Sequence, residues 1–236
     1  MHKTLLSGSL ILGTEEQILP YQMRYLCRNV RLLKPDQKLI CVLIGLCLPH
    51  SSESIRQLIS KVYPDLDSLH NQTEVFRIQY LKERAILAPL NIDVDDVNVE
   101  CLNSMSGSGN TYFSVDVALN VAGNPDHSFP IEYLNTINMA GMPNYELTLK
   151  VGCPIILLRS LNPFDGLCNG TRMIATTLGE RVIEAKIVSG THYGQMAFIP
   201  RISLISNSSS GLPFNLRRRQ FPIRVAFGMT INKSQG

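Results

Sequence analysis

The chain has 236 residues, of which 44% are apolar and 17% charged. This balance excludes a disordered protein, and a chain of this length can bury a core without disulfides or metals. The formal net charge of +3 permits a nucleic-acid partner but does not require one.

The longest apolar run, Leu39–Leu48, has ten residues, against about 20 for a membrane span. Ser7–Ser9 interrupt the apolar start, unlike an export signal.

The six cysteines and five histidines have no metal-binding pattern. No two cysteines form a Cys-x-x-Cys pair, and the histidines are scattered. A zinc site needs clustered ligands to close its coordination tetrahedron. We therefore expect no metal site, and buried, inert cysteines in a reducing compartment.

The first 75 residues form a segment of distinct composition. Leu39–Leu48 predicts a buried strand or a short core helix. A helix capped by Ser51 or Ser52 should follow, with Ile55, Leu58, Ile59 and Val62 on one face and its end at Pro64. Residues 66–76 are polar and predict a connector.

The next unit predicts one step of an α/β fold. Ala85–Ala88 is a short apolar run closed by Pro89, typical of a buried strand in a parallel sheet. Asn91 or Asp93 can cap the following helix. Its buried face should carry Val94, Val97 and Cys101 or Leu102. The carboxylates of its first turn favour the helix dipole, so they are not interpreted as a metal site.

From residue 131 the pattern predicts short strands joined by glycine-rich turns, as in a small β-barrel or sandwich. The expected strands are Leu147–Val151, Pro154–Leu158, Arg181–Val188 and Met196–Ile205, with a hairpin turn at Asn169-Gly170. A polar linker, Asn207–Gly211, precedes a buried strand, Phe221–Phe227. Thr230–Gly236 leaves that strand as a polar turn with hydroxyl, amide, ammonium and glycine groups. Such groups can hold phosphate oxygens beyond a strand end, but an ordinary polar loop has the same composition.

The stretch Arg219–Gly236 (RQFPIRVAFGMTINKSQG) closely resembles the fifth motif of the PIF-type ATP-dependent DNA helicases, the superfamily 1B group that includes the Helitron helicases. Tyr80–Asn98 (YLKERAILAPLNIDVDDVN) looks like their fourth motif. Further blocks resemble the inserted 2B domain: Pro130–Asn135, Leu149–Gly152, Leu157–Arg159 and Gly166–Arg172. The resemblance covers about residues 60–236.

The resemblance implies an α/β fold: an incomplete RecA-like motor domain of the P-loop NTPase type, with an inserted SH3-like 2B β-barrel. The motor domain would occupy residues 76–130 and 206–236, and the barrel residues 131–205. Residues 1–75 would be an N-terminal remnant.

Several family features are missing. No glycine in this chain precedes a lysine, so the Gly-x4-Gly-Lys-Ser/Thr phosphate loop is absent. No acidic strand end matches the metal-binding second motif, and the sixth motif would lie beyond Gly236. Leu90 stands where the family usually has Thr, and Asn232 where many members have His. The full-length family uses ATP and Mg; we expect this chain alone to bind neither and assign it no catalytic residue. A separate chain could supply the first motor domain.

The resemblance assigns DNA contacts residue by residue. Pro89 and Asn91 would face the single strand, and the contacts to its backbone would come from Thr230, Asn232 and Lys233. Coupling to the nucleotide cleft would fall to Ser234, Gln235 and Gly236. Weaker candidates on the barrel, equally readable as solvated strand positions, are Lys150, Arg159, Arg172 and Lys186.

Two further patterns leave alternatives open. Arg217–Arg219 has three interpretations: a nuclear import signal, a row of cations that contacts the DNA backbone, or a run of solvated side chains. Tyr112, Phe113 and Tyr193 could stack on bases, although packing is the commoner role.

The function expected from the resemblance is weak, ATP-independent binding of single-stranded DNA by part of a nuclear helicase of DNA repair, recombination and telomere maintenance. The alternatives are a decayed remnant that binds nothing and a protein-interaction scaffold.

Overall fold

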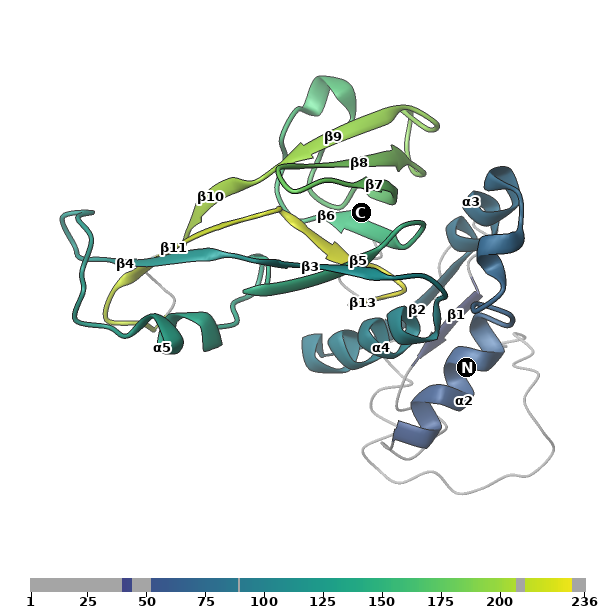
Figure 1. Cartoon of the computed structure of the whole chain (residues 1–236), viewed down its shortest axis with the longest axis horizontal. Helices are drawn as coiled ribbons and strands as arrows, with labels where there is room; N and C mark the ends of the chain where they lie inside the picture. The colour runs from purple at the N-terminus through teal and green to yellow at the C-terminus, as the bar shows by residue number, and fades with distance from the viewer. Residues whose placement is uncertain (1–39, 44–51, 89, 207–210, 231–236) are drawn as a thin grey trace, which may run out of the picture. The chain divides into compact units, whose positions relative to one another are not determined.

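The computed structural model describes residues 40–43, 52–88, 90–206 and 211–230, with the backbone alone for 40–43 and 52–54. These residues form a mixed α/β fold (Figure 1). The helices are α2 (Ser52–Val62), α3 (Glu74–Lys82), α4 (Asn91–Ser104) and α5 (Ile131–Thr136), with 3-10 turns η1 (Leu69–Asn71) and η2 (Pro163–Asp165). None of the helices described is long and apolar enough to cross a bilayer.

Three short parallel strands make the first sheet, in the order β1-β2-β13. Their bounds are Ile40–Leu43 (β1), Arg84–Ala88 (β2) and Gly228–Thr230 (β13). The strand predicted at Ala85–Ala88 is confirmed as β2. Ala85 and Leu87 pack with Met229 on one face of β2, while Ile86 joins the main core on the other. Burial on both faces explains why β2 is a continuous apolar run.

The strand predicted at Leu147–Val151 lies in another sheet. The other three strands predicted for the barrel lie, wholly or in part, in an antiparallel sheet with the order β12-β6-β7-β8-β9. Their bounds are β6 (Pro154–Leu157), β7 (Arg172–Leu178), β8 (Val182–Ile187), β9 (Met196–Pro200) and β12 (Ile223–Val225). The alternation predicted for β8 is confirmed, because Ile183, Ala185 and Ile187 are all buried. The core of this sheet is continuous with the core formed by α2, α3 and α4.

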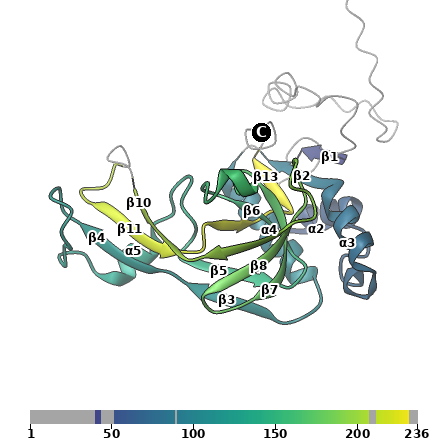
Figure 2. The same cartoon turned by 90° about the horizontal axis from the view of Figure 1, so that it is seen from above.

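A three-stranded antiparallel sheet in the order β10-β11-β4 has a small core of its own. It contains β4 (Val115–Leu119), β10 (Ile202–Ile205) and β11 (Asn215–Gln220), and α5 packs against β4 (Figure 2). Leu134 of α5 meets Ala118, Phe214 and Leu216 there. A fourth sheet pairs β3 (Gly109–Phe113) with β5 (Glu146–Lys150).

Two predicted strands differ from the strands observed. Within Phe221–Phe227 only Ile223–Val225 is a strand (β12), which pairs with β6, and β13 begins after this range, at Gly228, in the parallel sheet. Met196–Ile205 is divided after Pro200 into β9 and β10, which lie in two sheets. Apolar content predicted a strand in both stretches, but it carries no information on where each strand ends or which partner strand it chooses.

The predicted helices are confirmed, but one predicted cap is wrong. The N-cap of α4 is Leu90, which offers no side-chain hydrogen bond, and neither Asn91 nor Asp93 fills that role. The polar connector expected at 66–76 contains η1 and the start of α3, because Leu66 and Leu69 are buried in the core. The predicted turn at Asn169-Gly170 belongs to a longer β6–β7 loop in which Gly170 adopts a positive φ of 93°.

The cysteines differ in exposure. Burial raises the pKa of Cys153 to about 12 and that of Cys101 further above its usual range, so both thiols stay protonated at neutral pH. Cys168 is exposed, contrary to the expectation of burial. Among the residues the structure describes, no three His, Cys, Asp or Glu side chains gather as a metal site.

Candidate nucleic-acid interface

The carboxyl ends of β2 and β13 meet at one edge of the parallel sheet. Thr230 lies opposite Ala88 in the register, and the chain after β2 enters α4 at Asn91. Ligands bind at such strand ends in open α/β sheets. The structure therefore brings Asn91 and Thr230, two of the predicted DNA contacts, to the same edge.

Two buried polar side chains fix the backbone of β13 and of the residue before it. Asn98, in α4, accepts from the Gly228 N–H at 2.8 Å and donates to the Gly228 carbonyl at 3.3 Å. The Tyr63 hydroxyl donates to the Phe227 carbonyl at 2.8 Å. Burial raises the pKa of Tyr63 well above its usual range, so this phenol remains a donor at neutral pH. Together these bonds hold the strand that ends at Thr230.

Gly228 is a close-approach position between β13 and α4. A Cβ atom there would lie 3.2 Å from Val97 Cγ1 and 3.5 Å from the Ile86 carbonyl oxygen. A side chain would push the strand away from the helix and disturb the Asn98 contacts.

Arg224, on β12, binds the first turn of α4. Its Nη2 lies 2.6 Å from Asp95 Oδ1 and donates to the Asn91 carbonyl at 3.0 Å. Its Nη1 donates to the Asn91 side-chain oxygen at 3.2 Å. Arg224 therefore orients Asn91 and offsets the negative charge of Asp95 where α4 begins.

Arg224 was not among the predicted site residues, although it is the single charge in the apolar run Phe221–Phe227. An arginine at such a position indicates a specific partner, because an unpaired charge is costly to bury. The partner itself, Asp95, is 129 residues away in the sequence, which the local pattern cannot reveal.

The space at this edge is small. A pocket of about 10 Å³, lined by Val94, Arg224 and Thr230 among others, has room for about one water molecule. A larger hollow of about 540 Å³ lies between the β6–β7 and β8–β9 loops and is lined by Asn169, Gly170, Thr171 and His192 among others. The turn residues Asn169–Thr171 thus border a surface hollow.

The remaining predicted site residues lie outside the described part of the chain. They are Pro89, Asn232, Lys233, Ser234, Gln235 and Gly236. Their roles in DNA contact and nucleotide coupling stay predictions.

Three of the four cations offered as barrel contacts to DNA are engaged within the chain. They are Lys150 (Nζ to the Met105 carbonyl, 2.6 Å), Arg172 (Nη2 to the Leu81 and Arg84 carbonyls, 3.3 and 3.2 Å) and Lys186 (Nζ to Glu74 Oε1, 2.5 Å). The hydrogen bond from Lys186 lowers the pKa of Glu74. These three side chains join the antiparallel strands to α3, β2 and the end of α4, and Arg159 remains exposed.

Arg217–Arg219 is not a continuous solvated run. It lies in β11, and the central residue, Arg218, is fully buried in an ion pair with Asp116. Strand alternation places Arg217 and Arg219 on the opposite face. A patch that requires all three guanidinium groups at the surface is therefore excluded.

Two of the three aromatic residues considered for base stacking are exposed. Phe113 is 51% exposed and Tyr193 50%, whereas Tyr112 is buried against Phe221. The Lys82 ammonium lies 4.4 Å from the Tyr193 ring centroid. The Phe113 ring lies 5.5 Å from the Tyr145 ring, centroid to centroid, and about half of its surface remains exposed.

Comparisons with known proteins point to one family. Curated protein sequences give no match. Similar solved structures include the Pif1 helicase from Candida albicans (21% identity, TM-score 0.47, covering 64% of this chain and 36% of that one). Bacteroides Pif1 bound to ssDNA is 18% identical, with a TM-score of 0.44 and coverage of 80% and 51%. This chain thus spans about half or less of their length. Residues 132–178 match the model of the DNA helicase Pif1 2B domain, and this part of the chain therefore belongs to the 2B-domain region of the Pif1 helicase family.

Proposed function

We propose that this chain is part of a Pif1-type DNA helicase and binds single-stranded DNA without ATP. The observation that carries the proposal is a match to the 2B domain at residues 132–178 in a chain whose parallel strands end together beside α4. In this proposal, residues 76–130 and 206–236 form an incomplete RecA-like motor domain, and residues 131–205 form the small 2B barrel.

The edge of the parallel sheet suits phosphate contacts. The first turn of α4 has no side-chain cap, so its backbone N–H groups can meet an anion. The Thr230 hydroxyl stands at the neighbouring strand end, and Asn232 and Lys233 follow in the sequence. These groups read no base, so we expect binding that is independent of sequence.

ATP hydrolysis is assigned to other parts of the helicase. Bacteroides Pif1 has been solved in complex with ADP-AlF4, but the sequence of this chain contains no phosphate loop. The residues present therefore do not fit a nucleotide, and we derive no catalytic step. Turnover in this proposal needs a first motor domain, which a separate chain can supply, and the nucleus is the proposed compartment.

Fluorescence anisotropy with labelled oligo-dT, in the absence of nucleotide, tests the function. Lys233 is the cation among these phosphate contacts, so we expect the affinity to fall roughly threefold between 50 and 200 mM salt, since each neutralised phosphate contributes a slope of about 0.7 on single strands. Lys233→Gln and Thr230→Val should each weaken the binding of oligo-dT relative to the parent chain at the same salt concentration. A matched duplex of the same length, used as a competitor, should displace the oligo-dT poorly.

The alternatives give different results in that experiment. A folded chain that leaves oligo-dT free at 50 mM salt is a remnant or a protein-interaction scaffold. Binding that does not change with salt contradicts a phosphate-contacting surface. Circular dichroism of each variant separates lost binding from lost folding.

Asp95 and Arg224 should change DNA affinity in opposite directions. Asp95→Asn removes a negative charge beside the first turn of α4, so binding of oligo-dT should tighten about two- to fivefold. Arg224→Gln should weaken it by a similar factor, because Asn91 loses its partner and Asp95 loses its counter-charge. Both variants should change stability by about 1 kcal/mol or less, since the pair is partly exposed. Equal shifts in the same direction would rule out this electrostatic role.

A further inference from the structure

The sheet β10-β11-β4 has one buried face and one exposed face. Asp116, Ala118, Leu216 and Arg218 are buried on the side of α5. Side chains alternate along a strand, so the intervening residues point the other way. We call these the outer face: Val115, Val117, Ser203, Ile205, Asn215, Arg217 and Arg219.

The strand register groups two arginines with apolar neighbours. Arg219 lies between Val115 on β4 and Ser203 on β10, while Arg217 lies between Val117 and Ile205. Val115 is 61% exposed and Ile205 52%. Exposed apolar side chains beside cations form an uncommon surface for a solvated sheet, and one that suits a partner with both charged and apolar parts.

An exposed aromatic ring continues this surface. Residues 111–118 alternate strictly between exposed or half-buried and buried positions, which places Phe113 on the same side as Val115. The Arg201 guanidinium donates to the Phe113 carbonyl at 2.7 Å and fixes the backbone there. Phe113 therefore presents a half-exposed ring near the arginines of β11; its centroid lies 5.5 Å from that of Tyr145, and the rest of the ring faces outward.

The charge of the outer face is positive. None of its residues is acidic, and no ion pair within the described part of the chain includes Arg217 or Arg219. Glu146, opposite Phe113 on β5, is the carboxylate that borders it. Two free guanidinium groups on one strand, about 7 Å apart from the strand rise, match a partner with regularly spaced negative charges.

We propose that the outer face, together with Phe113, is a second contact surface for single-stranded nucleic acid. Arg217 and Arg219 bind consecutive phosphates, and an unpaired base stacks on Phe113. A duplex keeps its bases stacked inside, so it cannot use the ring, and an acidic peptide leaves the ring and the valines without a partner. The inference rests on the proposed function, and it adds a surface of this chain along which the single-stranded nucleic acid lies.

The test uses the full chain and fluorescein-labelled oligo-dT over a range of salt concentrations. Arg217→Gln with Arg219→Gln should lower the slope of log affinity against log salt by about 1.4, because two phosphate contacts are lost. Phe113→Ser should weaken binding at least about fivefold with little change in slope, and Phe113→Tyr should restore it. Glu146→Gln should tighten binding.

The matched control variants carry the same loss of positive charge or of aromatic surface at positions outside the outer face. Lys61→Gln with Arg181→Gln removes two exposed cations, and Phe164→Ser removes a ring that is 92% exposed. The control variants should bind like the parent chain, and melting curves of all variants should coincide.

The possible failures are distinguishable. If the parent chain binds oligo-dT and Lys233→Gln weakens it, but the outer-face variants and their controls behave alike, the outer-face proposal is overturned and the proposed function stands. If polyglutamate or duplex DNA competes as well as oligo-dT, the outer face is a general anion surface and the proposal is also overturned. A folded parent chain that binds nothing overturns both.

Discussion

Replacing Arg218 by methionine should lower the free energy of unfolding by about 3–5 kcal/mol, the range for breaking a buried ion pair from one side. Arg218 and Asp116 have no exposed side-chain surface, and Arg218 Nη2 lies 2.6 Å from Asp116 Oδ2. Methionine fills much of the same volume but leaves the carboxylate unpaired. Urea denaturation followed by circular dichroism measures the effect.

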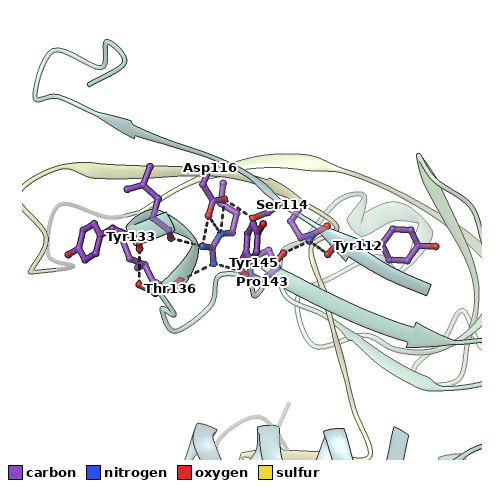
Figure 3. A network of polar contacts seen from close by, with 11 residues as sticks. Tyr112, Ser114, Asp116, Tyr133, Thr136, Pro143 and Tyr145 are labelled. Atoms are coloured by element: carbon purple, nitrogen blue, oxygen red, sulfur yellow. Dashed lines mark hydrogen bonds and ion pairs between the residues drawn. The ribbon is translucent and has the colours of Figure 1, made fainter. Parts of the chain in front are cut away.

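The loss is large because Arg218 also binds three backbone carbonyls. Nη1 donates to Ile137 and Pro143, and Nη2 donates to Leu134 (Figure 3). These carbonyls belong to α5 and the loop after it, so the guanidinium group ties both segments to β11. Hydrogen exchange should therefore show the earliest loss of protection in α5.

Three further variants separate charge from packing. Arg218→Lys keeps the charge but not the planar fork, so its effect should be intermediate. Asp116→Leu together with Arg218→Met should recover part of the loss, because no buried charge is left unpaired. Arg217→Gln, on the opposite face of the same strand, should change stability by about 0.5 kcal/mol or less. A loss below 1 kcal/mol in Arg218→Met contradicts the buried pair.

Much of the fold could be predicted because its signals are local. Pro89 closes an apolar run of strand length, and the run became β2. Ile183, Ala185 and Ile187 alternate with polar residues, which predicted the buried face of β8. Asn91 and Thr230 were predicted as DNA contacts from the family resemblance alone, and the structure places both at one edge of the parallel sheet.

The features that were missed depend on partners distant in sequence. Three adjacent arginines look alike, and the burial of Arg218 depends on Asp116, 102 residues away. The end of β12 at Val225 and the start of β13 at Gly228 depend on which residues β6 and β2 offer as partners. Lys150, Arg172 and Lys186 were interpreted as surface charges because their acceptors lie on other elements.

Asn98 is a polar residue on the apolar face of α4. The helical spacing indicates that position, but it does not indicate what the side chain binds. It lies on the helical face of Val94, Val97 and Cys101, and it is 4% exposed. An amide on an apolar helix face needs a partner, and here the partner is the backbone of Gly228. The side chain therefore links the core of α4 to the strand that carries the predicted DNA contacts.

Asn98→Leu should destabilise the chain by about 2–4 kcal/mol, because a side chain of similar size leaves the Gly228 N–H and carbonyl without their side-chain partner. It should also weaken oligo-dT binding at temperatures where the variant is still folded, since Thr230 lies only two residues beyond Gly228. Urea denaturation and anisotropy give the two readouts.

Asn110→Leu is the matched control, because Asn110 also donates to a carbonyl, that of Leu178, but at an exposed position. That control should change stability by about 0.5 kcal/mol or less. If Asn98→Leu loses stability but binds oligo-dT like the parent chain, the end of β13 does not contact the DNA. The DNA contacts must then be sought on the outer face of β4, β10 and β11.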